Sequence, residues 1–179
     1  MRILAASLAV LLTVAIPSSA TTLARATLEE LAQTSTHVVR GRVMTTHARL
    51  SGGVVSTAVT IQVSDRWKGP AGSSLTFALP GGRLGTLRQR AAGTPELVQG
   101  AEYIFFVWTS PKGNNQLLGL SQGVLEILTD SKGDTAVSRP LIAAELVDRV
   151  SGARVQDEGV SLTIEEFSAR MRRALGGSR

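Results

Sequence analysis

The chain has 179 residues, of which 43% are hydrophobic and 18% charged, so it is long enough for one packed domain and hardly for two. The low charge and the 18 glycines favour a β-rich protein with many turns over a helical bundle, and the net charge of +5 allows anionic partners without requiring them. The absence of cysteine excludes disulfides, thiol catalysis and Cys-ligated zinc.

Residues 1–20 predict a signal peptide. Arg2 gives a positive start, the run 3–16 is apolar, and Ser18 and Ala20 fit the small-x-small rule for cleavage after Ala20. The alternative is a membrane anchor, but the run is shorter than the roughly 20 apolar residues that span a bilayer, and no later segment is long and apolar enough. We therefore expect a periplasmic or secreted protein with no integral membrane span after cleavage, and a single domain at 21–179.

The mature chain begins with a predicted short helix at 28–33, where Thr27 and Glu30 form a capping box. The segment that follows, 37–47, alternates like a strand. Its predicted core face holds Val39, Gly41, Val43 and Thr45. Because glycine weakens strand pairing, Gly41 predicts a bulge or a sharp bend.

The clearest period-two pattern lies at 54–67, after a Gly-rich turn at 51–53. One face of this strand holds Val55, Thr57, Val59, Ile61 and Val63. Pro70 ends it, since proline cannot continue a central strand. A third strand is predicted at 73–79.

The segment 81–100 is rich in glycine and has no clear period. It carries Arg83, Arg88 and Arg90, with no acidic residue between Asp65 and Glu96. A connection this long inside a compact domain is usually functional or disordered. Its arginines can bind carboxylates, phosphates or acidic sugars, and the alternative is a mobile, solvated loop.

The second half of the chain returns to strands. The strongly apolar segment 101–109 predicts a central strand, buried on both faces. The segment 116–129 predicts a long strand with a bulge at Gln122 and Gly123, and 135–138 a short strand. The segment 140–159 is ambiguous, with a possible short helix at 143–150.

The last element is a predicted amphipathic helix that starts at a second capping box, formed by Thr163 and Glu166. Its apolar stripe holds Ile164, Phe167, Met171 and Leu175. The basic residues on its other face raise membrane contact as an alternative. We expect the helix to dock on the sheet, with its arginines solvated.

About six mostly antiparallel strands with a helix at each end predict a mainly β fold, a small OB-like antiparallel barrel. A β-sandwich is the second interpretation. The long strands and the mid-strand glycines favour the barrel.

Short motifs run through nearly the whole mature chain: Thr27-Leu28-Glu29-Glu30-Leu31, Val38-Val39-Arg40-Gly41-Arg42-Val43, Trp67-Lys68-Gly69-Pro70, Pro80-Gly81-Gly82-Arg83, Gly119-Leu120-Ser121-Gln122-Gly123 and Glu166-Phe167. In their order the chain resembles a group of exported bacterial proteins. These resemble, at the level of fold, the OB-like barrel of tissue metalloproteinase inhibitors and netrin modules. The resemblance implies a fold more than an activity. Such inhibitors place an N-terminal cysteine on the catalytic zinc, and that mechanism does not transfer to a chain without cysteine.

Catalytic and metal signals are weak. At about 3.3 Å per residue, His37 and His47 would lie about 33 Å apart on one strand, too far to share a metal unless the strand is broken or bent sharply. No G-x-S-x-G motif marks a nucleophile, and Gly81-Gly82-Arg83-Leu84-Gly85 is not a P-loop. We assign no catalytic residue, no metal site and no cofactor.

Two functions remain. The first is an exported, non-catalytic module that binds a protein, in the manner of a protease inhibitor, or an anionic glycan through the 81–100 loop. The second is a hydrolase with an unrecognised site, which would need a deep polar pocket holding a perturbed acid or base. Nucleic acid is not expected, because the chain is predicted to be exported and has few aromatic residues for stacking.

Overall fold

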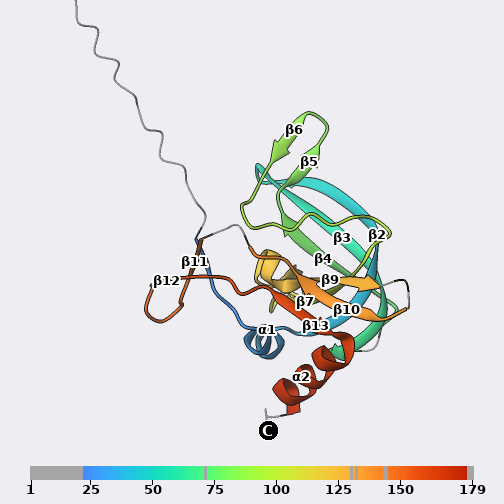
Figure 1. Cartoon of the computed structure of the whole chain (residues 1–179). Coiled ribbons are helices and arrows are strands. Elements are labelled where there is room, and N and C mark those ends of the chain that lie inside the picture. Colours follow the sequence, from blue (N-terminus) through green and yellow to red (C-terminus); the bar gives the residue numbers. More distant parts are fainter. Residues whose placement is uncertain (1–21, 71, 130, 132, 143–144, 177–179) are drawn as a thin grey trace, which may run out of the picture.

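The computed structural model describes residues 22–70, 72–129, 131, 133–142 and 145–176, and the predicted signal peptide lies outside them. The described chain is mainly β, with two α-helices and a sheet of eight strands (Figure 1). The helices are α1 (Leu28–Thr34) and α2 (Ile164–Gly176), with a 3₁₀ turn, η1 (Leu120–Gly123). The strands are β1 (Thr22–Ala24), β2 (His37–Ser51), β3 (Val54–Lys68), β4 (Ser74–Pro80), β5 (Gly82–Leu84), β6 (Leu87–Gln89), β7 (Glu102–Thr109), β8 (Asn115–Leu117), β9 (Val124–Thr129), β10 (Thr135–Arg139), β11 (Glu145–Val147), β12 (Arg154–Val155) and β13 (Val160–Thr163).

The long hairpin β2–β3 is the centre of the sheet, whose strand order is β13-β10-β9-β7-β2-β3-β4-β8. The predicted strand, turn, strand and proline stop are all present. The register of β2 on β3 shifts between Arg40 and Gly41, which confirms the predicted irregularity at this glycine. A Cβ at Gly41 would lie 2.8 Å from the Gln62 carbonyl oxygen, so the close approach of the strands requires glycine here.

Five strands pair in a closed cycle. Strand β2 pairs with β3, β3 with β4, β7 with β8 and β7 with β2, all antiparallel. The cycle closes through one parallel residue pair, Ala78 of β4 with Gln116 of β8. The Asn115 side-chain amide adds a hydrogen bond to the Thr76 carbonyl, 3.0 Å long.

The core has two parts, one on each side of β7. Phe105 packs among the residues enclosed by the cycle, together with Val43, Ile61 and Phe77. Phe106 packs on the other side, under α1 and α2. This arrangement confirms that β7 is a central strand buried on both faces.

Both helices start as predicted. The capping boxes Thr27–Glu30 and Thr163–Glu166 are formed in both directions. The apolar face of α2 is docked, since the side chains of Phe167 and Met171 are fully buried. None of the helices in the described residues is both long and apolar enough to cross a bilayer.

Several predictions were wrong. Thr45 is exposed rather than in the core, because the register shifts between Val43 and Thr45. The predicted long strand 116–129 is interrupted by the 3₁₀ turn η1, not by a bulge.

The short helix considered for the ambiguous segment at 143–150 is not formed in its described part, because β11 occupies 145–147, and residues 143 and 144 lie outside the described residues. Strand β11 pairs in parallel with β1 and antiparallel with β12, which forms a second, three-stranded sheet. The buried side chain of Gln122 binds the backbone at the end of β1. Its amide oxygen accepts from the Ala26 N–H at 2.8 Å, and its amide nitrogen donates to the Ala24 carbonyl at 2.9 Å. Pairing with distant strands therefore overrides the local helical preference of this segment.

Candidate functional site

The segment 81–100 contains a small β-hairpin, β5–β6, that the sequence did not reveal. The turn between the strands is Gly85 and Thr86, and Gly85 takes a φ of +60°. Glycine at the first of two turn residues is typical of the hairpin turns that match strand twist. The hairpin projects at the end of the molecule opposite α1 and α2 (Figure 1).

This hairpin is tied to the end of β2–β3 by a set of hydrogen bonds. The Gln89 side chain accepts from the Val55 N–H at 2.6 Å and donates to the Gly53 carbonyl at 3.0 Å. The Thr57 hydroxyl donates to the Gly81 carbonyl at 2.8 Å, and the Gly81 N–H donates to the Val55 carbonyl at 2.8 Å. The hairpin is therefore a defined part of the fold rather than an irregular loop.

A glycine is required where the hairpin leaves β4. Gly82 has a φ of +143°, and a Cβ there would lie 2.3 Å from the Thr57 hydroxyl oxygen. That hydroxyl is held by its bond to the Gly81 carbonyl, so it cannot move aside without losing this bond.

The substitution Gly82→Ala is expected to lower the free energy of unfolding by up to about 3 kcal/mol, through backbone strain and the clash with Thr57. Gly85→Ala is the control, because Gly85 also has a positive φ but no atom lies within 4 Å of its Cβ position. Its cost is backbone strain alone, about 1 kcal/mol. Urea unfolding measures the free energy of unfolding of both variants. Equal losses of stability would show that the contact with Thr57 adds nothing to the cost at Gly82.

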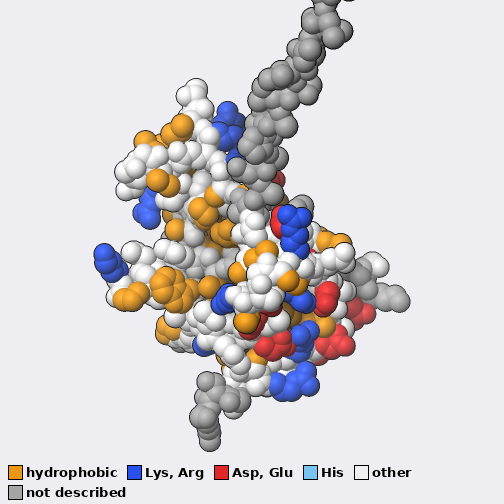
Figure 2. Space-filling view, turned by 90° about the vertical axis from the view of Figure 1, so that its left-hand side faces the viewer, with side chains coloured by type: hydrophobic (Ala, Val, Ile, Leu, Met, Phe, Trp, Pro, Cys, Tyr) orange, Lys and Arg blue, Asp and Glu red, His pale blue; other side chains and the backbone are white. Residues whose placement is uncertain are grey.

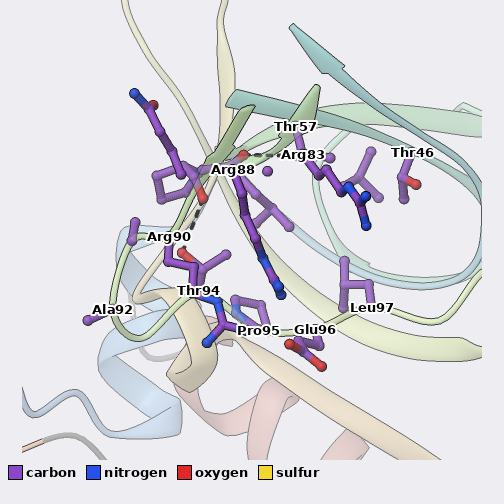
Figure 3. Close-up of a pocket in the computed structure, with 17 residues that line it drawn as sticks. Thr46, Thr57, Arg83, Arg88, Arg90, Ala92, Thr94, Pro95, Glu96 and Leu97 are labelled. Atoms are coloured by element: carbon purple, nitrogen blue, oxygen red, sulfur yellow. Dashed lines mark hydrogen bonds between the residues drawn. The ribbon is translucent and has the colours of Figure 1, made fainter. Parts of the chain in front are cut away.

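The hairpin covers a cavity of about 700 Å³, within the size range of ligand clefts, roughly 300–1,000 Å³. All three predicted arginines, Arg83, Arg88 and Arg90, line it. Figure 3 shows their side chains extending into the same space, with Glu96 at its edge. The structure thus brings the predicted site residues together and adds an acidic group that was not assigned to the site.

Positive charge is concentrated on one face of the hairpin. Arg83 and Arg88 are direct cross-strand partners, so their side chains leave the same face. Like charges in this arrangement destabilise a strand pair. Among the described residues, neither these two arginines nor Arg90 takes part in an ion pair, and the Arg83 Nε donates only to the Gly85 carbonyl, at 3.3 Å. These guanidinium groups are exposed and available to an anion.

An aliphatic wall forms part of the cavity lining, which also includes Thr46, Thr57 and Thr94. Val59 of β3 and Leu79 of β4 form its base, and Leu97 and Pro95 come from the segment that follows the hairpin. Sequence analysis placed Val59 on one face of its strand but gave no sign that it lines a cavity, because the position of the hairpin above β3 was unknown. The site therefore offers cations and apolar surface together.

Shifted pKa values are found elsewhere. Burial lowers the pKa of His37, and the charge of Arg66 lowers it further. Burial also lowers the pKa of Lys68, whose Nζ donates to the carbonyls of Ala32 and Gln33, 2.8 Å each. The pKa is lowered as well at Glu30, Glu102, Asp148 and Asp157. None of these groups lines the cavity that holds Arg83, Arg88 and Arg90, which we call the arginine cavity. The described residues hold no cluster of three or more potential metal ligands among His, Asp and Glu.

A second charged site was missed by the sequence analysis. Arg139 and Asp157 form a bidentate ion pair, with both N–O distances 2.9 Å, beside a cavity of about 310 Å³. Both side chains are over nine-tenths buried. No signal marked them, because Arg139 ends β10, just before the ambiguous segment 140–159, and Asp157 lies near the end of that segment.

Comparison with known proteins assigns no family. No protein-family model matches the chain, and no curated protein sequence matches it.

Proposed function

We propose that this chain is an exported, non-catalytic binding module with an OB-like barrel, and that its 81–100 loop binds an anionic partner. The observation that carries the proposal is the arginine cavity, where Arg83, Arg88 and Arg90 converge without carboxylate partners among the described residues. Arginine binds carboxylates and phosphates through paired, charge-assisted hydrogen bonds.

The fold and the N-terminal sequence both support this proposal. The cycle β2-β3-β4-β8-β7 has five strands, the number expected for an OB barrel, and the cavity lies over β3 and β4, the second and third strands of the cycle. OB barrels bind oligosaccharides and oligonucleotides at the face of these two strands. The pattern of residues 1–20 supports export to the periplasm or the medium.

Two classes of partner fit the site: an acidic protein, bound in the manner of a protease–inhibitor pair, and an anionic glycan. Both present carboxylates to the arginines. A hydrolase stays the second candidate, and Glu96 is the one carboxylate on the cavity wall. A general acid or base there would need a nucleophile or a bound water in reach of its carboxylate. Three guanidinium groups beside a single carboxylate favour the binding of an anion, so binding without turnover is the function that we propose.

The test is binding of labelled oligoglutamate and oligouronate to the purified protein, measured by fluorescence anisotropy. The triple variant Arg83→Ala, Arg88→Ala, Arg90→Ala is expected to bind about tenfold or more weakly, since each charge-assisted hydrogen bond contributes about 1.5–3 kcal/mol. Raising the salt concentration should weaken wild-type binding and bring it closer to that of the variant.

The matched control is Arg149→Ala, Arg172→Ala, Arg173→Ala. It removes the same charge from exposed positions remote from the cavity lining, and none of these residues forms an ion pair among the described residues. Its affinity should match that of the wild type. Equal binding by the two triple variants, or no binding of either probe by the wild type, contradicts the proposal.

A further inference from the structure

The arginine cavity has a lining that distinguishes between the two partner classes. Its cations are all arginine, and the chain from 69 to 111 contains no lysine. Arginine is enriched in protein–protein interfaces, where lysine is depleted, because the guanidinium is weakly hydrated and keeps its hydrogen-bond geometry when water is removed. A protein partner therefore suits these cations well.

The aliphatic wall points to the same class. Val59, Leu79 and Leu97 line the same cavity as the arginines, and none of the described lining residues is aromatic. A glycan presents hydroxyl groups in most directions, and hydroxyls placed against this wall would lose hydrogen bonds to water without replacement. A ligand with an aliphatic side chain beside a carboxylate can contact the aliphatic residues and the arginines at the same time.

Apolar surface continues outside the cavity. Leu84 and Leu87 are cross-strand partners on the hairpin face that turns away from the arginines, and each is 41% exposed. Leu50 and Val54, at the tip of β2–β3, are 50% and 61% exposed. Figure 2 shows hydrophobic and basic side chains together on this upper part of the molecule. Exposed apolar residues gathered on one part of a surface are typical of a protein-binding site.

We infer that the cavity binds an extended acidic segment of a partner protein, in which an aliphatic side chain lies between two carboxylates. The carboxylates pair with Arg83 and Arg88, and the aliphatic side chain contacts Leu79 and Leu97. The occupant is fixed by charge complementarity, since the unpaired cations and the aliphatic wall line one cavity. This inference rests on the proposed function and narrows its partner to one class.

The test compares labelled peptides that are identical except for a central tripeptide. The tripeptide is Glu-Leu-Glu, Glu-Ser-Glu, which changes its middle residue, or Gln-Leu-Gln, which changes its two outer residues. The wild-type protein is expected to bind Glu-Leu-Glu about tenfold more tightly than Glu-Ser-Glu, because a buried leucine side chain gains about 1.5–3 kcal/mol. Gln-Leu-Gln should be weaker than Glu-Leu-Glu by about tenfold or more, because its neutral amides lose the charge-assisted bonds. An oligouronate of equal charge should also bind about tenfold more weakly than Glu-Leu-Glu.

The variant Leu97→Ala distinguishes the loss of a ligand contact from a general loss of structure. Leu97 is partly buried, so its removal should reduce affinity for Glu-Leu-Glu and leave that for Glu-Ser-Glu unchanged. A general loss of structure would weaken both, and the wild-type peptide comparison does not depend on this variant folding.

The outcomes separate the inference from the proposed function. If the oligouronate binds through the three arginines as tightly as Glu-Leu-Glu or more so, or if Glu-Ser-Glu equals Glu-Leu-Glu, the inference is overturned and anion binding stands. If no probe shows dependence on Arg83, Arg88 and Arg90, both are overturned.

Discussion

The substitution Asp157→Ala is expected to lower the free energy of unfolding by about 3–5 kcal/mol, the usual cost of leaving one buried charge unpaired. The side chains of Arg139 and Asp157 are only 9% and 8% exposed, so water cannot replace the lost carboxylate. The Asp157 carboxylate also accepts from the Ile142 N–H at 2.8 Å. Among the described residues the buried Nε of Arg139 has no hydrogen-bond partner, so the variant would also remove the described partner of the other two guanidinium nitrogens.

The same ion pair gives the stability a defined pH dependence. Burial raises the pKa of Asp157, but hydrogen bonds from Arg139 and Ile142, with the charge of Arg139, outweigh it and hold the pKa below its ordinary value. A carboxyl with a lowered folded-state pKa stabilises the fold above its unfolded-state pKa, about 3.9, and loses that contribution as the pH falls through the folded value. The difference between wild type and Asp157→Ala should therefore be full at pH 7 and shrink below about pH 4.

Urea unfolding across this pH range makes the measurement. Glu145→Ala is the control, since it breaks an ion pair with Arg154, a side chain that is 82% exposed. Its effect should stay within about 1 kcal/mol. A loss of this small size for Asp157→Ala, or a difference from wild type that does not change with pH, would contradict the role assigned to the pair.

Phe167→Ala is expected to cost about 3–5 kcal/mol, as for other large aromatic side chains removed from a core. The ring is fully buried between α2 and the sheet. It meets the Trp67 ring edge-on at 4.9 Å and the Phe106 ring at 6.3 Å. Its removal leaves a cavity at the contact that holds α2 on the sheet.

Urea unfolding gives the free energy. Tryptophan fluorescence of the native state gives a local reading when it is measured in a Trp108→Phe background, because the remaining indole, Trp67, packs directly on the removed ring. Phe167→Leu should lose less, since it fills more of the space. Arg172→Ala, at an exposed position of the same helix, should be close to neutral. If Phe167→Ala were as mild as Arg172→Ala, α2 would not depend on this contact.

The parts of the fold that the sequence predicted are those with strong local patterns. Strand β3 alternates without interruption, and the capping residues Thr27 and Thr163 mark the helix starts through bonds within four residues. Strand β11 has no such pattern, because its conformation is set by pairing with β1 far away in the chain. The small hairpin β5–β6 was missed for a related reason, since arginines and glycines stand where alternating apolar residues would mark strands.

For the candidate site, the sequence supplied the cations but not the walls. Arg83, Arg88 and Arg90 stand out as basic residues in a long glycine-rich segment. The contribution of Leu79 and Leu97 depends on the path of the chain over β3 and β4, which follows from the tertiary bonds of Gln89 and Thr57. Local patterns do not encode such bonds.

The position of β1 has a consequence for the order of folding. Thr22 pairs with Glu145, and Gln122 holds Ala24 and Ala26, so the first described strand completes its contacts only with the last third of the chain. The local hairpin β2–β3 closes a short loop and can form early, whereas the β1 contacts close a very long one. We therefore expect the chain to stay incompletely folded until most of it is available, because the contacts of β1 are made with its last third.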